Sequence, residues 1–238
     1  MEPEPGYTVA SSPPDRGATM RVTKPISYVV ASTPRSGTGY IAQTLSRLGL
    51  RCGHEGCFRP DGQSYWQREG AMGDASWLAV PFIDRLPPGT VVLHQTRDPV
   101  KAINSINSGA RYFREWPQTR EDYLGSDPYR RFIIDHTSGW TWPDGEAGRG
   151  AHFWHNWHRW IEGAARRRGD LRYFRYRLED LDAELLGRIR GLILDEEGVP
   201  EEVPDVPGDY NHRDAVRDSI SREALPDGAA ELAGRYGY

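Results

Sequence analysis

One stretch near the start of the chain limits its possible folds more than any other, because an apolar run enters a short loop and an amphipathic run leaves it. Residues 26–31 are apolar, and residues 32–40 read Ser-Thr-Pro-Arg-Ser-Gly-Thr-Gly-Tyr. Over residues 40–48, apolar side chains recur on one face of a helix. The stretch therefore predicts a buried strand, a tight loop and a helix that ends at Gly49.

The composition of this loop suits a bound anion. Several backbone N–H groups and a helix N-terminus would point at one spot, where partial positive charge favours a phosphate or sulfate ester. Gly37 and Gly39 allow close approach of the backbone, Arg35 supplies a forked cation, and Ser36 and Thr38 offer hydroxyl groups. An ordinary strand-to-helix turn with capping Ser and Thr residues is the alternative interpretation.

A second element of the same kind follows downstream. Residues 91–96 predict a buried strand that ends at the cation Arg97, and Pro99 is well placed as the first residue of a helix. Ser105 lies two turns into that helix. Both Arg97 and Ser105 could therefore reach one phosphate beside the first loop.

Together the two elements resemble the sulfotransferase family. Its members carry a P-R/K-S-G-T loop for the 5′-phosphosulfate, and an R-D/N-P…S element for the 3′-phosphate, of 3′-phosphoadenosine 5′-phosphosulfate (PAPS). The matching residues are 34–38 and 97–99 with Ser105. Weaker matches lie at residues 74–79, 153–157, 176–181 and 232–238. Two departures are Leu178, where the family commonly has Tyr, and the missing R-K-G clamp of the cytosolic animal branch.

The resemblance implies a three-layer α/β fold of the P-loop sulfotransferase type with a mostly parallel central sheet, as does the alternation of strands and helices. It also implies an enzyme that moves a sulfuryl group from PAPS to a hydroxyl of a small-molecule acceptor and releases adenosine 3′,5′-bisphosphate, without a metal. The donor would be held by Arg35, Ser36, Gly37, Thr38, Gly39, Tyr40, Arg97, Ser105 and Arg213. Arg35 would also stabilise the charge that grows on the leaving phosphate.

Sulfuryl transfer of this kind needs a general base near the 5′ end of the donor. Glu55 is the first candidate, because the bacterial members that this chain resembles tend to carry a carboxylate shortly after the first helix. His54 is the second candidate. In an extended segment these neighbours point to opposite faces, so only one would enter the site. A solvated carboxylate beside a structural histidine is the alternative interpretation of the pair.

The acceptor side of the site is expected in residues 112–150, which are too long and too aromatic for a mere connection. Asp122, Asp135 and His136 are candidates for acceptor contacts, although as solvated loop residues they need no function. The best-known base of the family is a histidine, so His94 also needs an interpretation. Its place inside a strand favours a buried structural role.

Two other functions compete with the sulfotransferase hypothesis. One is a kinase-like phosphotransferase with the same loop architecture, and the other is a non-catalytic nucleotide-binding module. The Walker A spacing G-x-x-x-x-G-K-S/T is absent, and no lysine lies between Lys24 and Lys101. An ATPase with its usual magnesium site is therefore disfavoured.

Length and composition bound the remaining expectations. At 238 residues the chain predicts a flexible tail over residues 1–20 and one domain over residues 21–238. A net charge of −4 argues against a nucleic-acid partner. No run is apolar enough for a membrane span, and two cysteines without an export signal favour the cytoplasm. The acceptor's identity and the oligomeric state stay open.

Overall fold

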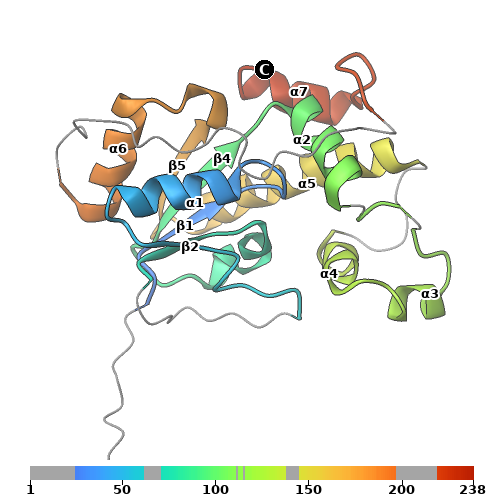
Figure 1. The fold of residues 1–238 in the computed structure, drawn as a ribbon, viewed down its shortest axis with the longest axis horizontal. Helices are drawn as coiled ribbons and strands as arrows, with labels where there is room; N and C mark the ends of the chain where they lie inside the picture. Colours follow the sequence, from blue (N-terminus) through green and yellow to red (C-terminus); the bar gives the residue numbers. More distant parts are fainter. Residues whose placement is uncertain (1–24, 62–70, 111, 115, 138–144, 197–218) are drawn as a thin grey trace, which may run out of the picture.

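A computed structural model describes residues 25–61, 71–110, 112–114, 116–137, 145–196 and 219–238. Its centre is a five-stranded sheet in the order β2-β3-β1-β4-β5, in which every neighbouring pair is parallel (Figure 1). The strands are β1 (Tyr28–Ala31), β2 (Cys52–His54), β3 (Gly73–Ala75), β4 (Val91–Thr96) and β5 (Arg172–Arg177). This sheet confirms the predicted α/β class.

Helices cover both faces of the sheet and make three layers. The helices α1 (Thr38–Arg47) and α6 (Ala183–Leu194) pack with Val30 and Leu93, whereas the 3-10 helix η1 (Trp77–Arg85) and α5 (Glu146–Arg167) pack with Val29 and Val92. Successive side chains of a strand point to opposite faces, so the apolar runs of β1 and β4 bury both of their faces. The central strands are therefore fully enclosed.

A third apolar cluster joins the C-terminal part of the chain to the helix after β4. It contains Ala102 of α2 (Pro99–Ser105), Trp154 of α5 and Leu232 of α7 (Asp227–Arg235). Figure 1 shows α7 and α2 close together above one end of α5. A short 3-10 helix, η3 (Leu178–Asp180), follows β5. This packing brings residues late in the sequence next to the helix that carries Ser105.

Two regions differ from the sequence-based expectation. The sequence pattern did not indicate β3, because three residues are too few to show a strand period, and η1 follows directly after it. Residues 112–150 contain the helices α3 (Arg120–Leu124) and α4 (Pro128–His136). Their N-caps are Thr119 and Asp127, each of which accepts a backbone N–H bond.

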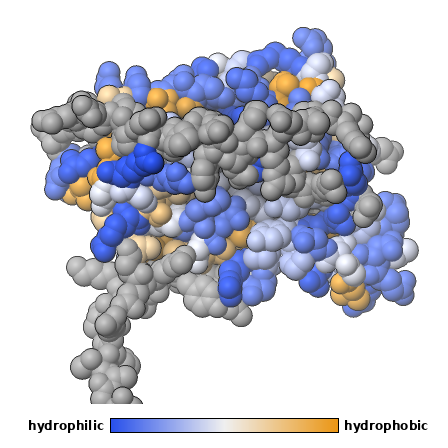
Figure 2. Space-filling view, in the orientation of Figure 1, coloured by the Kyte–Doolittle hydropathy of each residue, from blue (hydrophilic) through white to orange (hydrophobic). Residues whose placement is uncertain are grey.

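The surface in Figure 2 carries mainly hydrophilic residues, and its hydrophobic residues form small separate patches. Within the described ranges, no helix is long and apolar enough to cross a membrane. The predicted tail over residues 1–20 lies outside the described residues.

Candidate functional site

The two predicted anion-binding elements start from neighbouring strands. β1 and β4 pair in parallel, with Ala31 opposite His94, so their carboxyl ends lie at the same edge of the sheet. The loop 32–37 leaves β1 at this edge, and Arg97 directly follows β4. After β3 the chain crosses β1 to form β4, and ligands of open α/β sheets bind at such a reversal of strand order.

The loop after β1 leads into α1 through two residues with left-handed backbones. Arg35 and Gly37 both have left-handed backbones, with φ of 63° and 84°. Gly37 is the N-cap of α1, and no side chain of the described residues caps that helix. Its first N–H groups are therefore available to an anion.

Internal hydrogen bonds hold this loop in place. The hydroxyl groups of Ser36 and Thr33 are 2.6 Å apart, and Ser36 is fully buried. The Gln95 side chain donates to the Ser36 carbonyl at 2.6 Å, and Gln95 in turn accepts from Tyr176. Ser36 thus shapes the loop through its own hydrogen bonds, which the sequence did not predict.

The two elements touch through their arginines. Arg35 Nε donates to Ser105 Oγ over 3.1 Å, and the Arg97 guanidinium donates to the Arg35 carbonyl. Burial lowers the pKa of Arg97, and the carboxylates of Glu179 and Asp98 oppose this shift. Because an arginine stays charged in proteins, the predicted donor residues Arg35, Arg97 and Ser105 form one cationic cluster.

Residues from the C-terminal half fix the position of the Arg97 element. Asp98 caps α2 through the N–H groups of Val100 and Lys101 and pairs with Arg222 at 2.8 Å. Glu179 accepts the Asp98 N–H at 3.0 Å. Glu179 lies in the 176–181 segment that the resemblance singled out, whereas nothing in the sequence pointed to Arg222.

Glu55 and His54 do not point to opposite faces, which corrects the prediction. His54 ends β2, but Glu55 has a left-handed backbone with φ of 50°, so the strand alternation stops between them. Their side chains approach to 3.7 Å, from His54 Nε2 to Glu55 Oε1. His54 Nε2 also lies 3.1 Å from the hydroxyl of Thr38 at the start of α1. Both candidates therefore lie beside the loop.

The pKa values of the two candidate bases shift in opposite directions. Burial, together with the negative charge of Asp74, raises the pKa of Glu55 to about 7, although the indole of Trp77 donates a hydrogen bond that opposes the shift. Burial lowers the pKa of His54. Glu55 is therefore a carboxylate whose proton affinity suits proton transfer near neutral pH.

Aromatic side chains from the 112–150 segment lie beside Glu55. The rings of Tyr112 and Tyr129 stack with centroids 5.9 Å apart, and both contact the Trp77 ring, at 5.7 and 6.0 Å. Burial raises the pKa of both tyrosines, and the charge of Glu55 raises it further. This segment thus reaches the candidate base.

The three polar candidates of this segment serve local structure. Asp122 forms a capping box with Thr119, and Asp135 accepts the Tyr123 hydroxyl at 2.5 Å. His136 Nδ1 bonds the Phe132 carbonyl at 2.8 Å. None of these contacts involves the loop or Glu55.

His94 is a core residue, as predicted. It is fully buried and lies 2.7 Å from both the Tyr173 hydroxyl and His158 Nδ1. Arg213, the remaining predicted donor contact, lies outside the described residues. In the described ranges, no group of three or more His, Cys, Asp or Glu side chains could hold a metal ion.

No protein-family model matches the chain, and no curated protein matches it significantly. The geometry of the site is therefore the basis for a functional assignment.

Proposed function

We propose that this protein is a sulfotransferase with the P-loop sulfotransferase fold, which moves a sulfuryl group from PAPS to a hydroxyl of a small-molecule acceptor. The observation that carries the proposal is the direct contact between the two predicted phosphate elements, Arg35 with Ser105 and Arg97 with the Arg35 carbonyl. A donor with phosphate groups at both ends of its ribose needs two such anion sites next to each other.

The predicted donor residues would form two neighbouring anion sites. The open N–H groups of α1 and the Arg35 guanidinium would bind the 5′-phosphosulfate, while Arg97 and Ser105 would bind the 3′-phosphate. Glycine is required at position 37 because a Cβ there would lie 2.6 Å from the Leu178 side chain. PAPS supplies an activated sulfuryl group and a good leaving group.

The acceptor side supplies the base. Glu55 would accept the proton of the acceptor hydroxyl while the hydroxyl oxygen forms a bond to sulfur. The bond between sulfur and the bridging phosphate oxygen breaks, and its electron pair goes to the 5′-phosphate of adenosine 3′,5′-bisphosphate. Arg35 would stabilise the charge that develops there. Tyr112 and Tyr129 would flank the acceptor, because both rings lie beside Glu55.

Calorimetric titration with adenosine 3′,5′-bisphosphate, with and without magnesium and beside ATP, tests the donor site. We expect metal-independent binding that weakens by about tenfold or more in Arg97→Ala, since a charged hydrogen bond contributes about 1.5–3 kcal/mol. Arg47→Ala is the matched control, because Arg47 is an exposed residue in the last turn of α1. A preference for ATP with magnesium, or equal affinity of Arg97→Ala and wild type, would favour a kinase-like phosphotransferase instead.

A further inference from the structure

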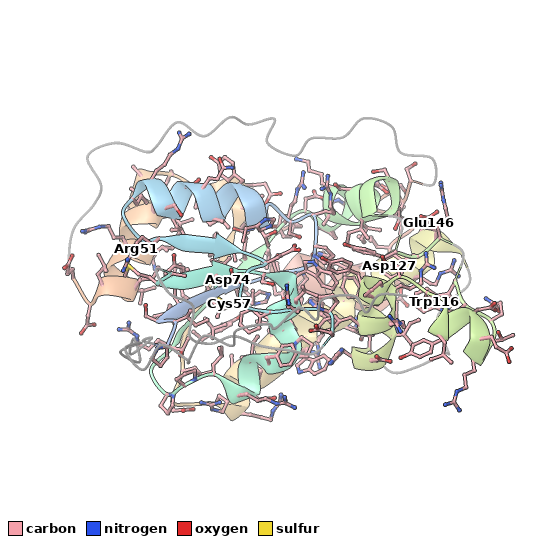
Figure 3. All side chains as sticks on the ribbon, turned by 60° about the horizontal axis from the view of Figure 1, so that its bottom comes forward. Arg51, Cys57, Asp74, Trp116, Asp127 and Glu146 are labelled. Carbon is pink, nitrogen blue, oxygen red and sulfur yellow. The ribbon has the colours of Figure 1, made fainter. Side chains whose placement is uncertain are left out.

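Asp74 is a buried carboxylate that the proposed chemistry does not use directly. It lies in the middle of β3 with no exposed surface. Its two oxygens accept the N–H groups of Gly56 and Cys57, each at 3.1 Å. Figure 3 shows Asp74 and Cys57 next to each other at the sheet. The carboxylate thus holds the turn that follows Glu55.

The neighbouring strand leaves room for this carboxylate. Gly53 of β2 is the register partner of Asp74. A Cβ on Gly53 would lie 2.5 Å from Asp74 Oδ1, which is closer than real Cβ atoms come to other atoms. The absence of a side chain at Gly53 therefore lets Asp74 reach across β2 to the turn beyond it.

The residues that follow Asp74 hold Glu55 itself. The Ala75 carbonyl accepts the Glu55 N–H at 3.1 Å, and the Trp77 indole donates to the Glu55 carboxylate. Glu55 keeps a left-handed backbone that L-residues with a side chain rarely adopt, and such a conformation persists only where surrounding contacts enforce it. Residues 74–77 thus fix the backbone and side chain of Glu55 from one side.

Asp74 also acts on Glu55 through its charge. After burial, the negative charge of Asp74 is the second cause of the raised Glu55 pKa. A carboxylate next to a second carboxylate holds its proton more tightly, because two like charges at close range repel. The same residue therefore contributes both to the position of Glu55 and to its raised pKa, of which burial is the larger cause.

We propose that Asp74 is a positioning residue for Glu55, whose carboxylate fixes the turn that carries Glu55 and places a negative charge beside it. The inference rests on the proposed function only in its consequence for turnover, because the hydrogen bonds of Asp74 to the turn and its charge effect on Glu55 belong to the protein without substrate. If Glu55 is the base, Asp74 adjusts the base to neutral pH without touching donor or acceptor.

The direct test is the titration of Glu55 by NMR in the full-length protein labelled with carbon-13 at the glutamate carboxyls, with the signal assigned by Glu55→Gln. In the wild type we expect Glu55 to titrate near pH 7, and in Asp74→Asn at lower pH, because a neighbouring negative charge is removed. Asp84→Asn is the matched control, since Asp84 lies far along η1 in an exposed pair with Arg167. It should leave the Glu55 titration unchanged.

Two results would overturn the proposal: a wild-type Glu55 that titrates at the ordinary value of about 4.5, or one that is unmoved by Asp74→Asn. Should Asp74→Asn fail to fold, Gly53→Ala provides a second route, because its new methyl group displaces the Asp74 carboxylate without removing it. We then expect the Glu55 titration to move from its wild-type position, and an unmoved titration would count against Asp74.

Activity adds a readout that depends on the proposed function. In Asp74→Asn the acid limb of the kcat/KM profile should move to lower pH, while kcat at pH 8 falls by about tenfold to a hundredfold because the base is displaced. The affinity for adenosine 3′,5′-bisphosphate should stay unchanged. If the NMR shift appears but the protein binds no donor nucleotide, the sulfotransferase assignment fails and the role of Asp74 toward Glu55 stands.

Discussion

Glu55 combines three features of a functional carboxylate in one residue. It is largely enclosed, its backbone is left-handed, and its pKa is raised to about 7. Structural carboxylates more often have a partner that lowers their pKa, as Asp170 has in Arg168. A group that is half protonated near neutral pH can accept a proton in one step and release it in the next.

We therefore predict a pH-dependent rate controlled by Glu55. Only the ionised carboxylate can act as a base, so kcat/KM should rise as the pH increases toward about 7 and level off above it. Glu55→Gln keeps an oxygen that can accept the Trp77 hydrogen bond, yet it should lower turnover by about 10²–10⁴-fold. PAPS turnover across a pH series, with any hydroxyl acceptor found by screening, measures both effects.

His54→Gln is the companion variant. It should retain the acid limb of the profile, because the pKa of His54 is already lowered by burial. If the rise of kcat/KM toward pH 7 disappeared in His54→Gln but remained in Glu55→Gln, His54 would be the base instead. Unchanged donor affinity with no turnover in any variant or the wild type would favour a non-catalytic nucleotide-binding module.

At the scale of elements, the unit of β1, loop and α1 would form most of the proposed donor site. Two glycines with the same backbone conformation flank α1: Gly37, with φ of 84°, before the helix and Gly49, with φ of 82°, after it. Their surroundings differ. A Cβ on Gly37 would meet Leu178, whereas one on Gly49 would have no atom within 4 Å. The two positions therefore separate backbone strain from crowding of the loop.

We predict that Gly49→Ala destabilises the fold by about 1–2 kcal/mol, the usual cost of a left-handed backbone for a residue with a Cβ. Gly37→Ala should destabilise the fold by more than Gly49→Ala, because the Leu178 side chain must also move. Affinity for adenosine 3′,5′-bisphosphate should fall in Gly37→Ala alone. Urea denaturation and calorimetry measure the two effects, and equal donor affinity in both variants would contradict the placement of the donor at this loop.

At the scale of the whole molecule, a buried histidine pair joins the sheet to two helices. His94 of β4 and His158 of α5 are 2.7 Å apart, and the Tyr236 ring at the end of α7 packs edge-on against both. Burial is the main cause that lowers both pKa values, to about 3 for His158, and the charge of Arg175 acts in the same direction. Both side chains are therefore neutral in the folded protein at physiological pH.

This pair should make the fold sensitive to acid. In the unfolded chain His158 binds a proton below its ordinary pKa of 6.5, whereas in the folded state it binds one only near pH 3. The contribution of neutral His158 to stability is therefore complete above pH 6.5 and is lost as the pH falls toward 3. Each such group gives a slope of about 1.4 kcal/mol per pH unit in this window. Glu55 has the opposite sign, because its raised pKa favours the folded state at low pH.

His158→Gln isolates the histidine effect, since it leaves Glu55 unchanged. The free energy of unfolding, measured by urea denaturation at pH 5 and pH 7, should differ less between the two pH values in the variant than in the wild type. An equal difference in the two proteins would show that His158 takes up no additional proton on unfolding.

The sequence by itself determined the local features. The apolar runs of β1 and β4, the amphipathic helices and the two cationic loops are patterns within a few residues, and the structure has strands and helices at these places. The core position of His94 followed in the same way, from its place inside a strand. The sequence pattern missed β3, because three residues are too few to reveal a strand period. The predicted alternation of His54 and Glu55 was wrong, because the strand ends between these two residues.

Only the tertiary structure decided which residues meet. Ser105 lies 70 positions from Arg35, and Arg222 lies 124 from Asp98. Tyr129 belongs to α4, whereas the Glu55 that it neighbours lies in the turn after β2. Such contacts depend on strand order and on the packing of side chains across the sheet, which no local pattern encodes. The sequence thus predicted that the two anion-binding elements lie side by side, and the fold shows the contacts that join them, because parallel strands β1 and β4 end at the same edge.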